Sequence, residues 1–218
     1  SNKFFRLGRY GVYSKVAGFE REWVGTNSFV PIADQFLGGG NNLNAVTQGA
    51  SAAVVAGTKI QKWNGTTAYN IYTWNGSDWG GHGQETLNPG EGAFLVNAST
   101  NTYYVTFAGL VPRGLYAIGK SFNFSYDFIS APVPVGGAIM ADLHFNPGVF
   151  DFIIPWRNGG FWTYIYDPMD LDPGSDTPTG WYDNNNNYCA EPIINIGESF
   201  FYYQNSEPKI PWLWNWTY

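Results

Sequence analysis

Two glutamates stand at the same place in a motif that the chain contains twice, here called the Gly-Glu motif. It reads Leu-Asn-Pro-Gly-Glu-Gly-Ala-Phe at residues 87–94 and Ile-Asn-Ile-Gly-Glu-Ser-Phe-Phe at residues 194–201, which places Glu91 and Glu198 after a glycine turn. Two carboxylates about 5–10 Å apart are the acid and base of glycoside hydrolysis. Because each glutamate would lie in its own module, we instead expect each carboxylate to accept backbone N–H groups and to fix the strand that follows.

A second group of carboxylates lies between residues 167 and 183. It consists of Asp167, Asp170, Asp172, Asp176 and Asp183. Clustered oxygen ligands suit Ca²⁺, for which Asp170, Asp172 and Asp176 are the best set. The spacing is not that of an EF-hand, because Pro173-Gly174-Ser175 interrupts it, and a solvated acidic loop is the favoured alternative.

Other residue types with chemical potential are isolated. His82 and His144 have no spaced Cys, His or Asp partner, and no zinc, phosphate-loop, dinucleotide or nucleophile-elbow motif is present. Cys189 is the single cysteine and could form an intermolecular disulfide, act as a reactive thiol or fill a small apolar space, of which the last is favoured. The sequence therefore predicts a protein that is not an enzyme and has no cofactor apart from the calcium ion considered above.

The chain ends in an aromatic run. In an extended strand Trp212, Trp214, Trp216 and Tyr218 would share one face. This face could close the core of the second module, form a platform for sugar rings, or dock on a neighbouring subunit by strand addition.

Composition limits the class of protein. The chain has 218 residues, of which 44% are hydrophobic, 19% aromatic and 13% charged. This composition argues against a disordered chain. It also provides more aromatic rings than the cores can bury, so that some are available for ligands or partners. The net charge of −6 disfavours nucleic acid, and no apolar run is long enough for a membrane span.

The charge is uneven along the chain. Residues 1–24 contain five basic and two acidic residues, a net +3, so the remainder carries −6 − 3 = −9. A basic end on an acidic body could steer subunits head to tail, and Lys3, Arg6 and Arg9 are the candidate contacts. The alternative is a solvated terminal segment.

Several features favour export. There is no initiator Met or signal peptide, which fits a processed, mature chain. Five Asn-x-Ser/Thr sequons are candidate glycosylation sites, although a chain rich in Asn, Ser and Thr also produces them by chance: Asn64, Asn75, Asn97, Asn123 and Asn215. We expect an extracellular or cell-surface protein.

The elements that must position these residues are strands. Residues 59–63 alternate polar and apolar up to Asn64-Gly65, a strong hairpin signal. Ile32 and Leu43 recur as Ile129 and Met140, each 97 residues later. We predict an all-β chain with an N-terminal arm (1–28), two antiparallel β-sandwich-like modules (29–114 and 115–218) and a Trp-rich C-terminal strand.

The motif order has a likeness elsewhere. Five short motifs follow one another between residues 62 and 114. They are Lys-Trp-Asn-Gly at 62–65, Tyr-x-Trp at 72–74, Trp79, the Gly-Glu motif, and Thr-Phe-x-Gly-x-Val-Pro-x-Gly at 106–114. This succession resembles a duplicated β-repeat of secreted, largely uncharacterised proteins of environmental bacteria, over roughly residues 29–205. The second copy departs from it at Ile196 and Ser199. The resemblance implies export and a duplicated β-module, and it carries over no catalytic residue.

These observations lead to two hypotheses. The first is an exported structural protein that assembles with copies of itself into a filament or surface layer, through the basic arm or the tryptophan tail. The alternative is a carbohydrate-binding or adhesive module that uses Trp74, Trp79, Trp181 and the terminal tryptophans as platforms. A hydrolase is third, since no catalytic constellation is present.

Overall fold

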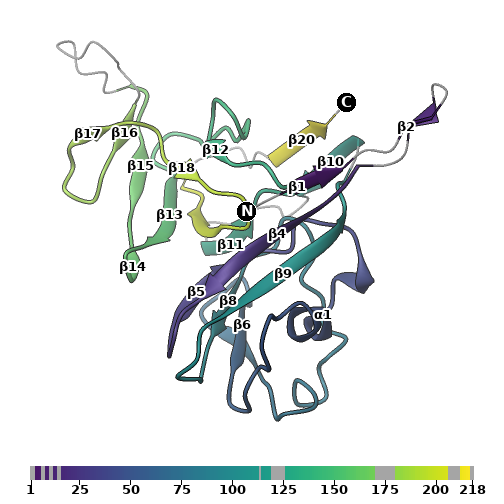
Figure 1. Ribbon diagram of the computed structural model, residues 1–218. Coiled ribbons are helices and arrows are strands. Elements are labelled where there is room, and N and C mark those ends of the chain that lie inside the picture. Colours follow the sequence, from purple (N-terminus) through teal and green to yellow (C-terminus); the bar gives the residue numbers. More distant parts are fainter. Residues whose placement is uncertain are drawn as a thin grey trace.

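The computed structural model describes residues 3–5, 8–9, 12–13, 16–112, 114–118, 126–169, 180–205 and 212–216. In these residues the protein is nearly all β, with several antiparallel sheets (Figure 1). The described helices are short: the 3₁₀ turn η1 at Gly39–Asn41 and α1 at Leu43–Gln48. The prediction of an all-β fold is confirmed.

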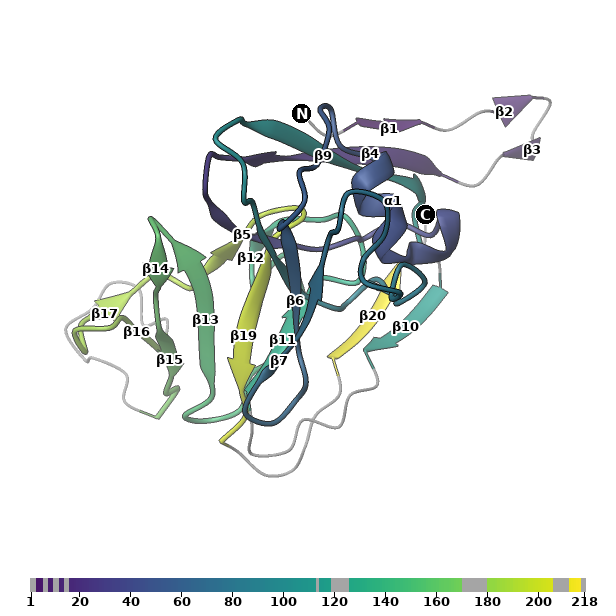
Figure 2. The same cartoon turned by 90° about the horizontal axis from the view of Figure 1, so that it is seen from below.

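The first module contains two antiparallel sheets (Figure 2). One has the order β1–β4–β9, with β1 Lys3–Phe5, β4 Ala17–Val24 and β9 Tyr103–Leu110. The other has the order β5–β8–β6–β7, with β5 Phe29–Ile32, β8 Ala93–Val96, β6 Lys59–Trp63 and β7 Tyr69–Thr73. Phe36, Leu43 and Trp79 are fully buried in the core that these elements enclose.

The second module is built around one large sheet. Its path is β11 Tyr126–Ser130, β19 Ser199–Tyr203, β13 Phe152–Arg157, β15 Tyr164–Tyr166, β16 Trp181–Tyr182 and β17 Tyr188–Cys189, with β14 Gly160–Phe161 beside β13. Two small sheets complete the module: β10 Gly114–Ile118 with β20 Trp212–Trp216, and β12 Gly137–Ala138 with β18 Ile193–Ile194. Trp181 and Phe200 lie at the centre of its core.

The two modules repeat each other strand for strand. The order β5–β8–β6–β7 recurs as β11–β19–β13–β15. The register recurs as well, because Pro31 lies opposite Phe94 in the first module as Phe128 lies opposite Phe201 in the second. In the same way the long β4–β9 ladder corresponds to β10–β20. This repeat of order and register gives residues of these four strands equivalents in the other sheet, and β16 and β17 extend the second sheet beyond it.

The start of the first module differs from the predicted boundary. Residues 17–24, which the sequence placed in an arm, form β4 and pair with β9 over eight positions. The inner face of this strand carries Glu20 and Glu22 among its buried or half-buried side chains, so it lacks the apolar alternation that marks a core strand. Before β4 the chain forms β1 and then a small hairpin, β2 Gly8–Arg9 with β3 Val12–Tyr13.

The tryptophan tail belongs to the second module. β20 pairs with β10 of the same chain, and Trp212 is 2% exposed, with its indole N–H donating to the carbonyl of Leu143 at 3.1 Å. The expectation that Trp212 contacts a neighbouring subunit is therefore replaced by a role in the core. For Trp214 and Trp216 the structure describes the strand and not the side chains.

Candidate functional site

An aromatic cluster joins the two modules. Phe94 from the first module and Phe128 and Phe201 from the second are buried together, and five further side chains pack on them: Phe29, Trp63, Tyr69, Ile154 and Trp156. Two backbone hydrogen bonds run beside the cluster, from Gly92 N to Phe128 O and from Ser130 N to Gly90 O, both 3.1 Å. The modules therefore meet through a shared core and a short stretch of sheet pairing.

The cluster is formed by equivalent positions of the repeat. Phe94 in β8 and Phe201 in β19 correspond to each other. Trp63 faces Tyr69 across the β6–β7 hairpin, as Trp156 faces Phe161 across β13–β14. Both hairpins turn at an Asn-Gly pair, whose glycines have positive φ angles (83° at Gly65 and 82° at Gly159). The Asn-Gly turns thus bring a pair of aromatic rings from each module to the boundary.

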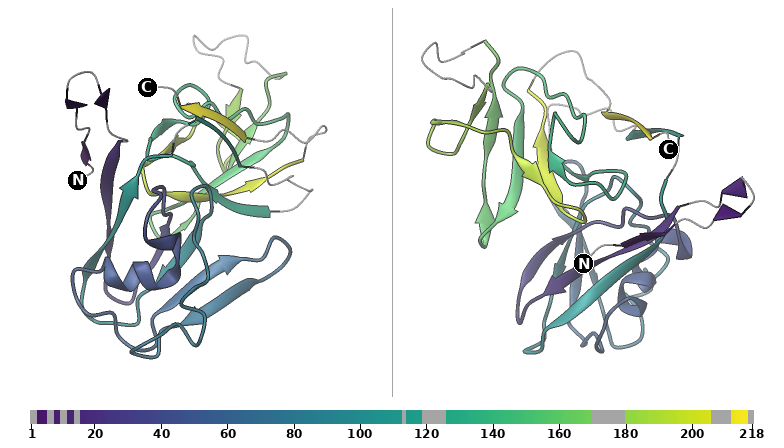
Figure 3. Two further views of the ribbon diagram at one scale, coloured as in Figure 1. Left: turned by 90° about the vertical axis from the view of Figure 1, so that its right-hand side faces the viewer. Right: turned by 45° about the horizontal axis from the view of Figure 1, so that its top comes forward.

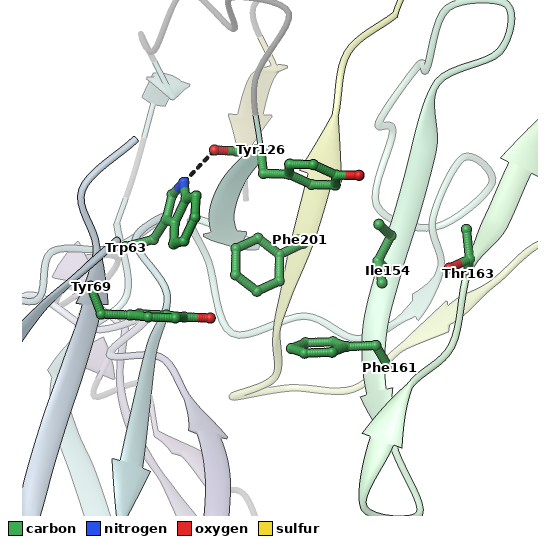
Figure 4. A pocket seen from close by; sticks show the side chains of 7 residues that line it. All are labelled: Trp63, Tyr69, Tyr126, Ile154, Phe161, Thr163 and Phe201. Carbon is green, nitrogen blue, oxygen red and sulfur yellow. Dashed lines mark hydrogen bonds between the residues drawn. The ribbon is translucent and has the colours of Figure 1, made fainter. Parts of the chain in front are cut away.

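One side of this cluster opens into a cleft of about 360 Å³ (Figure 4). The lining residues are Trp63, Tyr69, Tyr126, Ile154, Phe161, Thr163 and Phe201. Trp63 and Tyr69 come from the first module and the rest from the second, so neither module forms the cleft alone. Its volume lies within the range of small-molecule sites in proteins.

Phe201 forms the centre of the cleft, and other rings surround it edge-on (Figure 4). The ring of Trp63 lies 5.4 Å from it at 90°, that of Phe161 at 5.5 Å and that of Tyr126 at 6.2 Å. The indole N–H of Trp63 donates to the carbonyl oxygen of Tyr126, which fixes the plane of the indole. Edge-to-face packing of this kind stabilises ring orientations, so the aromatic lining is held in place before any ligand binds.

The cleft also has a few polar groups. Figure 4 shows the hydroxyl of Tyr69 directed into the cleft, and Thr163 stands at its far side. Partial burial raises the pKa of Tyr69, so its hydroxyl stays protonated and can donate as well as accept a hydrogen bond. The lining contains no charged side chain. The arrangement is suited to an uncharged ligand that has both an apolar face and hydroxyl groups.

The two repeated glutamates hold their turns, as expected from the sequence. Glu91 Oε2 accepts from the backbone N–H of Asn88 at 2.7 Å, and Glu198 Oε2 accepts from that of Asn195 at 2.8 Å. Each also has a cationic partner: Lys62 Nζ lies 3.3 Å from Glu91 Oε2, and Arg157 forms an ion pair with Glu198. These carboxylates are therefore occupied within separate turns.

A cluster of buried acids lies where the second Gly-Glu motif meets the first module. Glu20 is fully buried, and an ideal Cβ on Gly197 would lie 2.8 Å from its Oε1 and 2.5 Å from Oε1 of Glu22. Burial and the neighbouring carboxyls raise the pKa of Glu20 well above its ordinary value. Burial also raises the pKa of Glu22 to about 7 and that of Asp34 to about 6.

Gln35 connects this acidic cluster to the module boundary. Its Nε2 donates to the carbonyl of Ala131 at 2.9 Å, and its Oε1 accepts from the N–H of Gly197 at 2.8 Å. The side chain is fully buried and reaches across from the first module to the second. Gly197 is required here because its φ is 77° and because the carboxyls leave no space for a side chain.

The predicted calcium ligands Asp170, Asp172 and Asp176 lie outside the described residues, as does Arg6. Among the residues that are described, no group of three or more His, Cys, Asp or Glu has the arrangement of a metal site. For Lys3 and Arg9 the structure gives the strand and not the side chain. The calcium and arm hypotheses therefore stay predictions.

The sequons differ in accessibility. Asn64 and Asn75 are exposed. Asn97 is 2% exposed, and its Nδ2 donates to the carbonyls of Gly25 (2.7 Å) and Asn101 (3.0 Å). A glycan on this nitrogen would displace both bonds, so the structure leaves no place for it. Asn123 lies outside the described residues and Asn215 lies in β20.

Most tryptophans proposed as platforms are part of the two cores. Trp79 and Trp181 are fully buried, and Trp74 packs against the first core. Cys189 is half-buried against the second core. Trp63, which the sequence placed at the end of a hairpin strand, is a tryptophan that lines the cleft. The repeat itself was the signal that could have found it, because Trp63 and Trp156 are equivalent aromatic positions in two modules that must pack together.

The chain was compared with known proteins in three ways. No family model matches it, and no match was found among curated proteins or among solved structures. Within the described part of the chain, no helix has the length and apolar character that a membrane span needs.

Proposed function

We propose that the protein is a non-enzymatic, exported binding module that holds a neutral carbohydrate in the cleft between its two modules. The observation that carries this proposal is the lining itself: five aromatic rings, from Trp63, Tyr69, Tyr126, Phe161 and Phe201, surround one open cleft. Sugar rings present apolar C–H faces that pack on aromatic rings, and their hydroxyl groups bond to polar groups at the edge.

The balance of groups in the cleft supports a sugar over a charged ligand. An anionic ligand would need a Lys, Arg or backbone N–H cradle, and a cation would need a carboxylate. The lining offers aromatic carbon and the hydroxyls of Tyr69, Tyr126 and Thr163. Since the protein also carries a net charge of −6, acidic polysaccharides are disfavoured at long range.

The absence of catalysis is part of the proposal. Glu91 and Glu198 are the carboxylates that the repeat places symmetrically, and each accepts a hydrogen bond from its own turn. The cleft lining has no acid, base or nucleophile with a positioned partner. The geometry therefore supports binding without chemical change of the ligand.

Binding is tested with a glycan array and then by calorimetry on the sugars retained. Trp63→Ala removes one wall of the cleft and is expected to weaken binding about 5- to 150-fold, since stacking on one aromatic ring contributes about 1–3 kcal/mol. Trp23→Ala is the matched control, because Trp23 is 56% exposed on β4 and does not line the cleft.

Because Trp63 also packs in the cluster, a second variant separates binding from folding. Tyr126 is 45% exposed, so Tyr126→Ala is expected to keep the fold and still lower the affinity. No binding of the wild-type protein to any neutral glycan would overturn the proposal. If Trp23→Ala lost as much affinity as Trp63→Ala, the binding site would not be the cleft.

Self-assembly is a second candidate function, favoured by the N-terminal hairpin. In both views of Figure 3 the purple β2–β3 strands project away from the body. Residues 1–16 contain four basic residues and no acidic one, so the rest of the chain carries −6 − 4 = −10. A projecting basic element on an acidic body is suited to a head-to-tail contact between copies.

The assembly hypothesis is tested by size-exclusion chromatography and electron microscopy. Reversing three arm charges (Lys3→Glu, Arg6→Glu and Arg9→Glu) is expected to dissolve any oligomer or filament. High salt is expected to weaken the same contact, because a Debye length of about 8 Å screens exposed charges. A wild-type protein that stays monomeric at high concentration in low salt would exclude this function.

A further inference from the structure

A second cavity adjoins the aromatic cleft. It measures about 500 Å³ and is lined by Thr163, Ile165, Asp183, Asn184 and Asn186. Thr163 lines both cavities, so the two share a wall at this residue. The lining of the second cavity is mostly polar and that of the first is mostly aromatic, so the two cavities can contact different parts of one ligand. Here it is called the Asn groove.

The β16–β17 turn builds the polar side of the Asn groove. Asp183 Oδ1 accepts from the N–H groups of Asn185 (2.8 Å) and Asn187 (3.0 Å), and these bonds hold the pKa of its carboxyl below the ordinary value. Asn186 lies at the tip of the turn with a φ of 60°, and its side chain is exposed. The turn is therefore fixed by its own hydrogen bonds and leaves polar side chains facing solvent.

Thr163 connects this turn to the cleft. Its backbone N–H donates to Oδ1 of Asn184, which ties the β14–β15 connection to the β16–β17 turn. The same residue stands at the far side of the aromatic cleft in Figure 4. This hydrogen bond links the segments that line the two cavities.

We infer that the site takes a linear neutral oligosaccharide of at least two units, with one sugar ring in the aromatic cleft and the next in the Asn groove. This inference rests on the proposed function and deepens it. Amide groups and an ionised carboxylate bond to pairs of sugar hydroxyls, while the aromatic cleft selects the apolar face of a ring. Neither cavity is lined by Lys, Arg or His, and Asp183 would repel an acidic unit.

The inference predicts an affinity that depends on ligand length. Calorimetric titrations would use glucose, galactose, mannose and xylose, together with their neutral oligosaccharides of two to six units. Affinity is expected to rise at least tenfold from the single sugar to the bound oligosaccharide, and then to level off once both cavities are filled.

A variant confined to the Asn groove is expected to remove that gain and nothing else. Asn186→Gly deletes the amide while glycine keeps the positive φ, and Thr163→Val deletes the shared hydroxyl at nearly constant volume. Asn186→Gly should lower oligosaccharide affinity about three- to tenfold, the value of one hydrogen bond, and leave the affinity for the single sugar unchanged. Thr163→Val should lower the affinity for both ligands, because Thr163 lines the cleft as well as the groove. Asn185→Ala is the matched control, because Asn185 lies in the same turn and does not line the groove.

The outcomes separate this inference from the proposed function. If single sugars bind as tightly as oligosaccharides, or if Asn186→Gly and Thr163→Val change nothing, the Asn groove is not a subsite and the cleft alone binds. If none of these sugars binds the wild-type protein, both the proposed function and this inference are wrong.

Discussion

Two equivalent pairs of aromatic residues at the module boundary, here called corners, differ in how their rings pack. In the first module Phe29 stacks on Phe94 with centroids 4.0 Å apart and an interplanar angle of 21°. In the second module the equivalent pair is Tyr126 and Phe201, and these rings stand 6.2 Å apart at 89°. The first corner is closed and Phe94 is fully buried, whereas the second is open and forms the cleft.

The difference has a simple chemical origin. A phenylalanine at position 29 gains only by burial, so its ring lies flat on its neighbour. A tyrosine at position 126 has a hydroxyl that favours water, and its ring is 45% exposed. The structural repeat therefore presents the same aromatic arrangement twice, once closed within the core and once open as the cleft in which we propose that a ligand binds.

The largest contrast is expected on deletion of the central rings. Phe94→Ala should lower the free energy of unfolding by about 3–5 kcal/mol, because it leaves a cavity at a fully enclosed site. Phe201→Ala should cost less, about 3 kcal/mol, since one side of this ring already faces the cleft. Urea unfolding measures both, and a larger loss in Phe201→Ala would contradict the assignment of closed and open corners.

The equivalent strands β4 and β10 differ in charge, because the acidic cluster occurs on β4. β10 has Ala117 where β4 has Glu20, 97 residues earlier. The folded-state pKa of Glu22 is about 7 against 4.5 for an unperturbed carboxyl, so the folded state binds more protons between these values. The stabilising contribution of Glu22 is therefore complete below pH 4.5 and is lost as the pH rises to about 7, by on the order of 3 kcal/mol.

Glu20→Gln is the variant that tests this pH dependence. Removing one buried ionisable group should flatten the fall in stability between pH 4.5 and 7 and make the variant more stable than wild type at pH 8. Thermal unfolding across this pH range measures the difference. Parallel curves for the two proteins would show that the pKa of Glu20 is the same in the folded and the unfolded state.

The two Gly-Glu turns should also differ in their response to mutation. Glu198→Ala removes both the bond to Asn195 N and the ion pair with Arg157 at a nearly buried site, which should cost about 1–2 kcal/mol. Glu91→Ala should cost less than about 1 kcal/mol, because 28% of its side chain is exposed and water replaces part of the interaction. Chemical denaturation compares them, and equal costs would show that the greater burial of Glu198 does not strengthen its interactions.

The smallest effect is expected for the residue that distinguishes the corners. Tyr126→Phe removes one exposed hydroxyl, so the stability should change by less than about 0.5 kcal/mol. The ring is expected to turn toward Phe201 and narrow the cleft, and sugar affinity should fall. A crystal structure of the variant checks the ring position, and an unchanged cleft would show that the hydroxyl does not hold the corner open.

Much of the architecture could be predicted from local signals. The Asn-Gly turn at residues 64–65 predicted a hairpin and the repeated Gly-Glu motif predicted two turns, because turn chemistry acts within a few residues. The structural role of Glu91 was also predicted, since it depends on neighbouring residues. By contrast β4 was missed, because its inner face is acidic and has no local sign of burial.

The sequence by itself determined the all-β class, the Asn-Gly and Gly-Glu turns and the repeat of related segments. The tertiary structure decided which aromatic rings are core and which line a site: Trp79 and Trp181 are buried, while Trp63 and Tyr126 meet across the module boundary. An exposed and a buried tryptophan look alike in a strand, since burial depends on what packs against it from distant parts of the chain. For that reason the cleft exists only where the two modules join.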